Sequence, residues 1–211
     1  MADFNTLLQG YQRFREEGWS RERARWARLA EGGQSPKVMV IACSDSRDDP
    51  ATIFDTSPGE MFVVRNVANL VPRFETGGGR HGVSAALEFA VTQLEVPEIV
   101  VMGHGQCGGV DAALSRKFEH AAPGAGGFIA HWIDLLDEPR DRIIRDHGNG
   151  EEAARALERE TVRLSLQNLR TFPPVAERER TGALTLHGAY FAIADGTLHL
   201  LDESTGEFGP A

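Results

Sequence analysis

The chain has 211 residues, of which 41% are hydrophobic and 25% are charged, as is ordinary for a soluble globular protein. Its formal net charge of −9 argues against a protein that binds nucleic acid or anionic membranes, because those surfaces would repel it. No apolar run reaches the ~20 residues that span a bilayer, and the start, MADFNTLLQG, lacks the pattern of a secretory signal. We therefore expect a cytoplasmic protein of one domain.

Residues 4–30 carry apolar side chains at helical spacing and predict helices. The apolar positions of the first helix are Phe4, Leu7, Leu8, Tyr11 and Phe14. A second helix, in RERARWARLAEGG, would be capped by Ser20 and would end at its two glycines. An apolar stripe ahead of the main body is typical of helices that pack on a partner subunit. We therefore predict an N-terminal helical arm over residues 1–33 and an α/β core over residues 34–211.

Short apolar runs then alternate with helical patterns along the chain. Three continuous runs predict buried strands, namely KVMVIAC, MFVVRN and EIVVMGH. Helices are predicted in VSAALEFAVTQL, in GGVDAALSRK and over residues 151–171, where a proline pair would stop the last one. Two final strands, LTLHGAYFAIA and TLHLLDE, predict a hairpin that closes the chain. Strands that alternate with helices indicate an α/β fold with a mostly parallel central sheet flanked by helices.

The two cysteines of the chain both lie at the ends of predicted strands. Cys43 opens the motif CSDSR, which also holds Asp45 and Arg47, and Cys107 follows His104 by three positions in GHGQCGG. In a reducing cytoplasm, two cysteines are more often free, catalytic or bound to a metal than joined in a structural disulfide. Because ligands of parallel sheets gather at the carboxyl ends of the strands, the two thiols and the imidazole can meet if these strands are neighbours.

Two thiolates and one imidazole are ligands that suit Zn²⁺. Three protein ligands leave a position for water, which is typical of catalytic zinc, whereas structural zinc sites close with four. A water there can ionise and attack an electrophile, and Asp45, held by Arg47, can orient it. Each residue alone has a simpler interpretation: Asp45 and Arg47 as a loop ion pair, His104 as a core histidine, the cysteines as buried thiols. The joint pattern favours zinc chemistry.

Three segments, CSDSR, GEMFVVRNVANLVP and GHGQCGG, resemble the β-class carbonic anhydrases in their order and spacing. SLQNLRTFP and LHGAYFAIADGTL are also similar to that family, so the resemblance covers most of the chain. It implies one Zn²⁺ per subunit held by Cys43, His104 and Cys107, with a dyad of Asp45 and Arg47. It also implies reversible hydration of CO₂ to bicarbonate and a proton by zinc-bound hydroxide. In the closed state of the family, Asp45 would become a fourth zinc ligand.

The resemblance extends to assembly and to substrate binding. It implies a homodimer or homotetramer, with active sites near the subunit interface and N-terminal helices that embrace the neighbour. The stretch GQSP is similar to the plant-like branch of the family, in which its glutamine, here Gln34, donates to bound substrate. The apolar CO₂ pocket of that branch corresponds to Phe62, Val67 and Phe89, although the last is usually tyrosine there. Without the resemblance, these three would be core residues and Gln34 an exposed loop residue.

Other functions remain open from the sequence. Some relatives on this fold hydrolyse CS₂ or carbonyl sulfide, and a non-catalytic zinc-binding protein would keep the metal ligands. The intact pair of Asp45 and Arg47 favours the enzyme over the latter. A thiol redox protein would instead join Cys43 to Cys107 in a disulfide, but the chain has no Cys-x-x-Cys pair.

Overall fold

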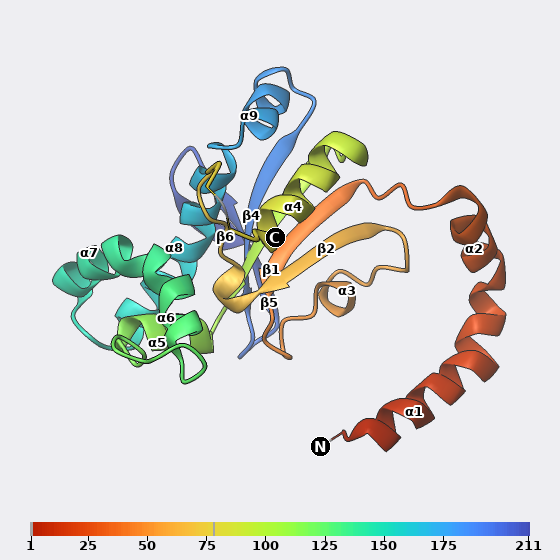
Figure 1. Cartoon of the computed structure of the whole chain (residues 1–211), viewed down its shortest axis with the longest axis horizontal. Coiled ribbons are helices and arrows are strands. Elements are labelled where there is room, and N and C mark those ends of the chain that lie inside the picture. The colour runs from red at the N-terminus through yellow and green to blue at the C-terminus, as the bar shows by residue number, and fades with distance from the viewer. Residues whose placement is uncertain (1, 78) are drawn as a thin grey trace.

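The computed structural model describes residues 2–77 and 79–211 (Figure 1). Within those residues the central sheet has six strands in the order β2-β1-β3-β4-β5-β6. The strands are β1 Val38–Cys43, β2 Met61–Asn66, β3 Glu98–His104, β4 Thr185–Ala192, β5 Thr197–Asp202 and β6 Glu207–Pro210. The first four pair in parallel, whereas β5 and β6 are antiparallel to their neighbours. The predicted α/β fold with a mostly parallel sheet is confirmed, and so is the hairpin of β4 and β5.

Helices cover the sheet and one of its ends (Figure 1). They are α1 Phe4–Arg13, α2 Trp19–Gly32, α3 Pro50–Ile53, α4 Gly82–Glu88, α5 Gly108–Leu114, α6 Gly127–Ile133, α7 Asp137–His147, α8 Glu151–Leu169 and α9 Pro173–Arg180. The proline pair does follow the end of α8, but it also begins α9, because proline is well tolerated in the first turn of a helix. Among the described residues, no helix combines the length and the apolar character that crossing a membrane requires.

Strands β1 and β3 are largely buried, as their continuous apolar runs predict. The same prediction is wrong for MFVVRN, because β2 lies at the edge of the sheet and none of its residues is buried. Met39 and Ile41 of β1 pack on one face with residues of α4, α8 and α9. Val40 and Ala42 point to the opposite face, where residues of α3 and β5 cover them. A third apolar cluster joins Cys43 to residues of α5, α7 and α8. The carboxyl end of β1 therefore lies against an apolar layer of helices.

The arm formed by α1 and α2 extends away from the sheet (red to orange in Figure 1). None of the α1 side chains is buried, and its apolar stripe includes Phe4 at 72% and Leu7 at 62% exposure. The arm meets the body along α2, where Arg25 in the middle of the helix forms an ion pair with Glu60 at 3.0 Å. In this single copy, none of the described residues buries the apolar stripe of α1.

The predicted role of Ser20 as a helix cap is wrong. The chain passes from α1 through a π-helical turn at Phe14–Gly18 directly into α2, so the residue lies inside a continuous helix. The Ser20 hydroxyl donates to the backbone carbonyl of Glu16 at 3.1 Å. Trp26 packs edge-on against Phe14 and stacks on Trp19, with ring centroids 6.0 and 5.5 Å apart. These aromatic contacts stabilise the continuous helix where the pattern suggested a break.

Candidate metal centre

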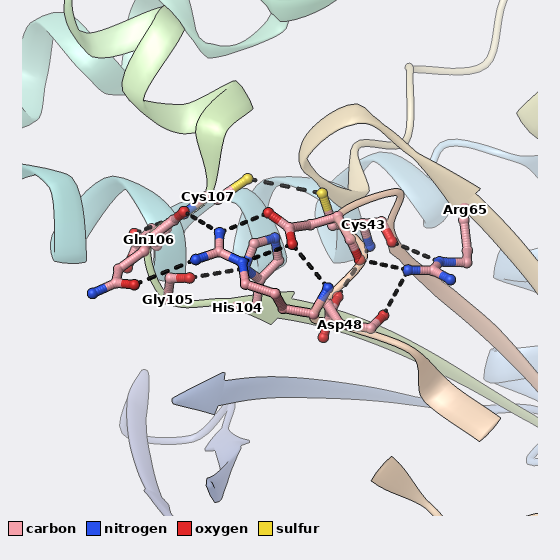
Figure 2. Close-up of polar contacts among 10 residues, drawn as sticks. Cys43, Asp48, Arg65, His104, Gly105, Gln106 and Cys107 are labelled. Carbon is pink, nitrogen blue, oxygen red and sulfur yellow. Dashed lines mark hydrogen bonds and ion pairs between the residues drawn. The ribbon is translucent and has the colours of Figure 1, made fainter. Parts of the chain in front are cut away.

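Two parallel strands bring the predicted ligands to one edge of the sheet. Cys43 is the last residue of β1 and His104 the last of β3, and these strands pair directly. Cys107 follows a tight turn and immediately precedes α5. The ligand atoms of the three residues lie within 4.8 Å of one another, and the two sulfurs are 3.9 Å apart (Figure 2). The two strands are thus neighbours, which was the condition for these three side chains to meet.

A strained backbone and a close helix contact shape the path from β3 into α5. Gln106 adopts a positive φ of 56°, and the Gly105 N–H donates to the carbonyl of Phe191 on β4 at 3.0 Å. A Cβ on Gly109 would lie 2.6 Å from Cγ1 of Val67, closer than real Cβ contacts come. Glycine at 109 therefore lets the segment after β2 approach the start of α5.

The environment of His104 fits a metal. The ring is 1% exposed, and its Nδ1 lies 2.8 Å from the carbonyl oxygen of Gly105, to which Nδ1–H can donate. Its Nε2 is buried without a hydrogen-bond partner. An orphaned buried nitrogen is costly unless a ligand satisfies it, and a metal ion does so. Two Zn–S bonds of about 2.3 Å at a tetrahedral angle place sulfurs roughly 3.8 Å apart, close to the separation seen here.

The two thiols behave as a coupled pair. A hydrogen bond from Cys107 lowers the pKa of Cys43 to about 4. The same interaction, together with burial, raises the pKa of Cys107. The shared hydrogen bond therefore favours ionisation of Cys43 over that of Cys107. Because both sulfurs must be deprotonated to bind zinc, metal binding would release any proton that the pair still holds.

Arg47 forms a bidentate ion pair with Asp45 beside the cysteines. Arg47 donates from Nε to Oδ1 at 2.9 Å and from Nη2 to Oδ2 at 2.8 Å. It also donates to the carbonyl of Gln106 at 3.0 Å, which ties the pair to the turn that carries Cys107. The hydrogen bonds from Arg47 hold the pKa of Asp45 well below its ordinary range. The carboxylate stays ionised at any physiological pH, and its side chain is 18% exposed.

Two further charged residues hold this loop, and the second of them, Asp48, was not predicted as part of the site. Arg65 donates to the carbonyl oxygens of Cys43 at 2.8 Å, Asp45 at 2.6 Å and Asp48 at 3.0 Å (Figure 2). Asp48 is completely buried and accepts from the Cys43 N–H at 3.3 Å. Burial is the main cause that raises its pKa to about 6. In the sequence Asp48 lies among the loop residues DDP, where an acidic residue gives no sign of burial.

The four predicted substrate-binding residues fall into two groups. Val67 directly follows β2 and packs near Gly109, close to the metal ligands. Phe62 instead pairs with Met39 near the opposite end of β1, about 13 Å from the strand's end at ~3.3 Å per residue. Its ring stacks on that of Phe89, with centroids 5.9 Å apart. Gln34 is exposed and precedes β1. A single chain does not bring these last three side chains to its own metal ligands.

Comparison with known proteins gives a consistent result. The family model described as carbonic anhydrase matches residues 38–198. A carbonic anhydrase of Synechocystis is 32% identical over 206 residues, which cover 96% of this chain and 72% of that protein.

Solved structures agree with that match. The β-carbonic anhydrase CcaA superposes with a TM-score of 0.89 at 31% identity, over 98% of this chain and 91% of that one. A structure reported with two tetrameric β-carbonic anhydrases of Sordaria macrospora gives a TM-score of 0.79 at 27% identity, over 94% and 96%. The fold is therefore shared with these proteins over nearly the full chain.

Proposed function

Because the chain belongs to the carbonic anhydrase family of lyases, in its β class, we propose that it catalyses the zinc-dependent, reversible hydration of CO₂ to bicarbonate and a proton. One observation carries the proposal: two thiols and a histidine with an orphaned Nε2 converge beside an ionised carboxylate. Cys43, His104 and Cys107 would hold one Zn²⁺ per chain. When bound, the metal supplies Lewis-acid chemistry that lowers the pKa of a water molecule.

Asp45 is the residue that we propose orients the reacting water. Its carboxylate, kept ionised by Arg47, accepts a hydrogen bond from the water and so directs an oxygen lone pair at the carbon of CO₂. The two hydrogen bonds from Arg47 favour an open site, because a carboxylate bound in this way is not free to become a fourth ligand. Orientation of this kind in a water-poor cleft contributes much of the acceleration in such reactions.

The substrate-binding residues support a site that is completed by a second copy of the chain. We propose that Val67 lines the CO₂ pocket of its own subunit. Gln34, Phe62 and Phe89 lie away from the ligands of their own chain, and we propose that they serve the site of a neighbour. There the Gln34 amide would donate to the developing bicarbonate, and the two rings would exclude water.

The assembly that this requires is a homo-oligomer, either a dimer or a tetramer. Its support is the exposed apolar stripe of α1, together with the similarity to structures described as tetrameric. We also propose that residues 1–33 act as an arm around the neighbour, that residues 34–211 form the catalytic core, and that the protein is cytoplasmic.

Substituting Leu7→Glu should weaken this assembly, because it places a charge in the apolar stripe of α1, where Leu7 is 62% exposed in the single chain. Light scattering after size-exclusion chromatography should give a lower mass than wild type at the same concentration. Gln9→Glu adds the same charge to the opposite side of the helix and should leave the mass unchanged. Equal masses for all three proteins would remove α1 from the interface.

Stopped-flow hydration of CO₂ tests the proposed activity itself. Protein loaded with one zinc per chain should hydrate CO₂, should lose the activity when a chelator removes the metal, and should regain it when zinc is restored. Loaded protein that hydrolyses CS₂ or carbonyl sulfide but leaves CO₂ unchanged would replace this function with that of a related hydrolase. Loaded protein without either activity would leave only zinc binding.

A further inference from the structure

Glu158 of α8 is a buried carboxylate for which the proposed reaction gives no role. It is 5% exposed, and both of its oxygens have partners. Oε1 accepts from the backbone N–H of Cys107 at 3.3 Å, and Oε2 accepts from the Tyr190 hydroxyl at 2.8 Å. We propose that Glu158 is a positioning residue that fixes the backbone of Cys107 and thereby sets the direction of its sulfur toward the metal. The inference rests on the proposed zinc site.

Two glycines allow α8 to come close enough for this contact. A Cβ on Gly103 of β3 would lie 2.8 Å from Cγ2 of Val162 and 3.3 Å from the backbone oxygen of Glu158. A Cβ on Gly188 of β4 would lie 3.0 Å from Cγ1 of the same valine. The helix therefore packs directly on the bare backbone of β3 and β4. From that position, the Glu158 side chain reaches past the end of β3 to Cys107.

Glu158 is the first member of a buried polar row on α8 that holds loops by their backbones. Thr161, Ser165 and Asn168 continue the row at helical spacing, and all are buried. Ser165 accepts from the Val71 N–H at 3.1 Å, and Asn168 donates to the Val71 carbonyl at 2.8 Å. These contacts fix the segment that follows β2. Within this row, Glu158 acts on the turn that carries a metal ligand.

The backbone of Cys107 needs such a partner. The residue is the N-cap of α5, so its N–H precedes the helix and has no partner within it, and the residue is only 2% exposed. A buried N–H without an acceptor is destabilising, whereas a carboxylate acceptor gives a stronger, charge-assisted bond. Cys43 shows the same arrangement, because its N–H is bound by the buried carboxylate of Asp48 at 3.3 Å. Each cysteine thus has its backbone held by a carboxylate, although only Glu158 comes from a distant element.

A carboxylate in this position affects the metal through the geometry of its ligand. The backbone of Cys107 sets the origin of the Cα–Cβ bond, and this bond directs Sγ. Partners that orient metal ligands typically alter metal affinity by about 10- to 100-fold when they are removed. The reach of the side chain, more than its charge, should therefore determine how tightly the site holds zinc.

Two substitutions separate the effect of the length of the Glu158 side chain from the effect of its charge. Glu158→Gln keeps the length and an oxygen acceptor but removes the charge, whereas Glu158→Asp keeps the charge but is one methylene too short to reach Cys107. Zinc affinity is measured by competition with a chromophoric chelator, and ligand geometry by the absorption bands of the Co²⁺-substituted protein. Glu158→Gln should resemble wild type in both readouts. Glu158→Asp should bind zinc about 10- to 100-fold more weakly and change the Co²⁺ bands.

Glu160, on the same helix, supplies the matched control. Its carboxylate pairs with Arg142 and Arg163, and its side chain is 17% exposed. Glu160→Gln and Glu160→Asp should leave zinc affinity and the Co²⁺ spectrum unchanged. Wild-type behaviour of Glu158→Asp would overturn the inference, as would an equal loss in Glu158→Gln or in the Glu160 variants. Failure of the wild type to bind zinc would instead refute the proposed metal site, and the inference with it.

Discussion

Asp45→Asn should slow CO₂ hydration by about 10²- to 10⁴-fold while zinc remains bound, because removal of a proton-accepting group from a reaction centre has effects of this size. Asparagine has the shape of aspartate, so the loop and its contact with Arg47 can persist. However, the amide lacks the charge that Arg47 holds in place through bonds of 2.9 and 2.8 Å. The experiment compares stopped-flow rates at equal zinc content.

Asp55→Asn serves as the control for this prediction. Asp55 is an exposed carboxylate in the same region of the chain, and its positive φ of 48° is one that asparagine tolerates well. The CO₂ hydration rate of Asp55→Asn should equal that of wild type. A wild-type rate in Asp45→Asn, with zinc bound, would remove Asp45 from the mechanism.

Cys107→Ala should abolish stoichiometric zinc binding, and CO₂ hydration should be lost with it. The substitution leaves only Cys43 and His104 as ligands, and two ligands do not meet the preference of zinc for at least three protein donors. Metal content is measured by elemental analysis after dialysis against a chelator, with circular dichroism to show that the variant folds. Cys43→Ala should behave in the same way. Full retention of zinc by either variant would refute the ligand assignment.

The two strands that position the site could be predicted from the sequence because neither has a polar face that could be exposed to water. VMVIAC and EIVVMGH are apolar without a polar face, so they belong in the centre of a sheet. Polar residues that directly follow such strands lie at its carboxyl edge, where Cys43 and His104 are found. The direct pairing of β1 with β3, which local pattern alone does not determine, then brings the ligands together.

Other elements depend on contacts that no local pattern reveals. β6 contains glycine and proline, which disfavour a strand, and it forms because β5 offers it an open edge. Helix α7 has no apolar stripe that would predict it, because its buried residues are Pro139, Arg140 and Ile143. Ser20 resembles a cap, yet the aromatic packing around Trp26 continues the helix through it.

Hydrophobic periodicity in the sequence also could not identify the residues that support the metal ligands. Glu158 does leave a signal, since it is a charged residue between Leu157 and Thr161 on the face of α8 that is otherwise buried. Its partner could not be inferred, because the approach of α8 to Cys107 depends on Gly103 and Gly188 in distant strands. In the proposed assembly, Gln34, Phe62 and Phe89 likewise acquire their role through a second copy of the chain, which no pattern within one chain reveals.

The most direct test of this account is stopped-flow CO₂ hydration by protein that carries one zinc per chain, measured at about pH 7 and again at about pH 9. The two hydrogen bonds from Arg47 engage both oxygens of Asp45, and the lowered pKa of Asp45 keeps it ionised in either condition, so this ion pair and the open site should persist at both. We therefore predict rapid hydration at both values of pH. Hydration only near pH 9 would contradict the proposed state of Asp45. Zinc-loaded protein that is inactive at both would contradict the proposed function.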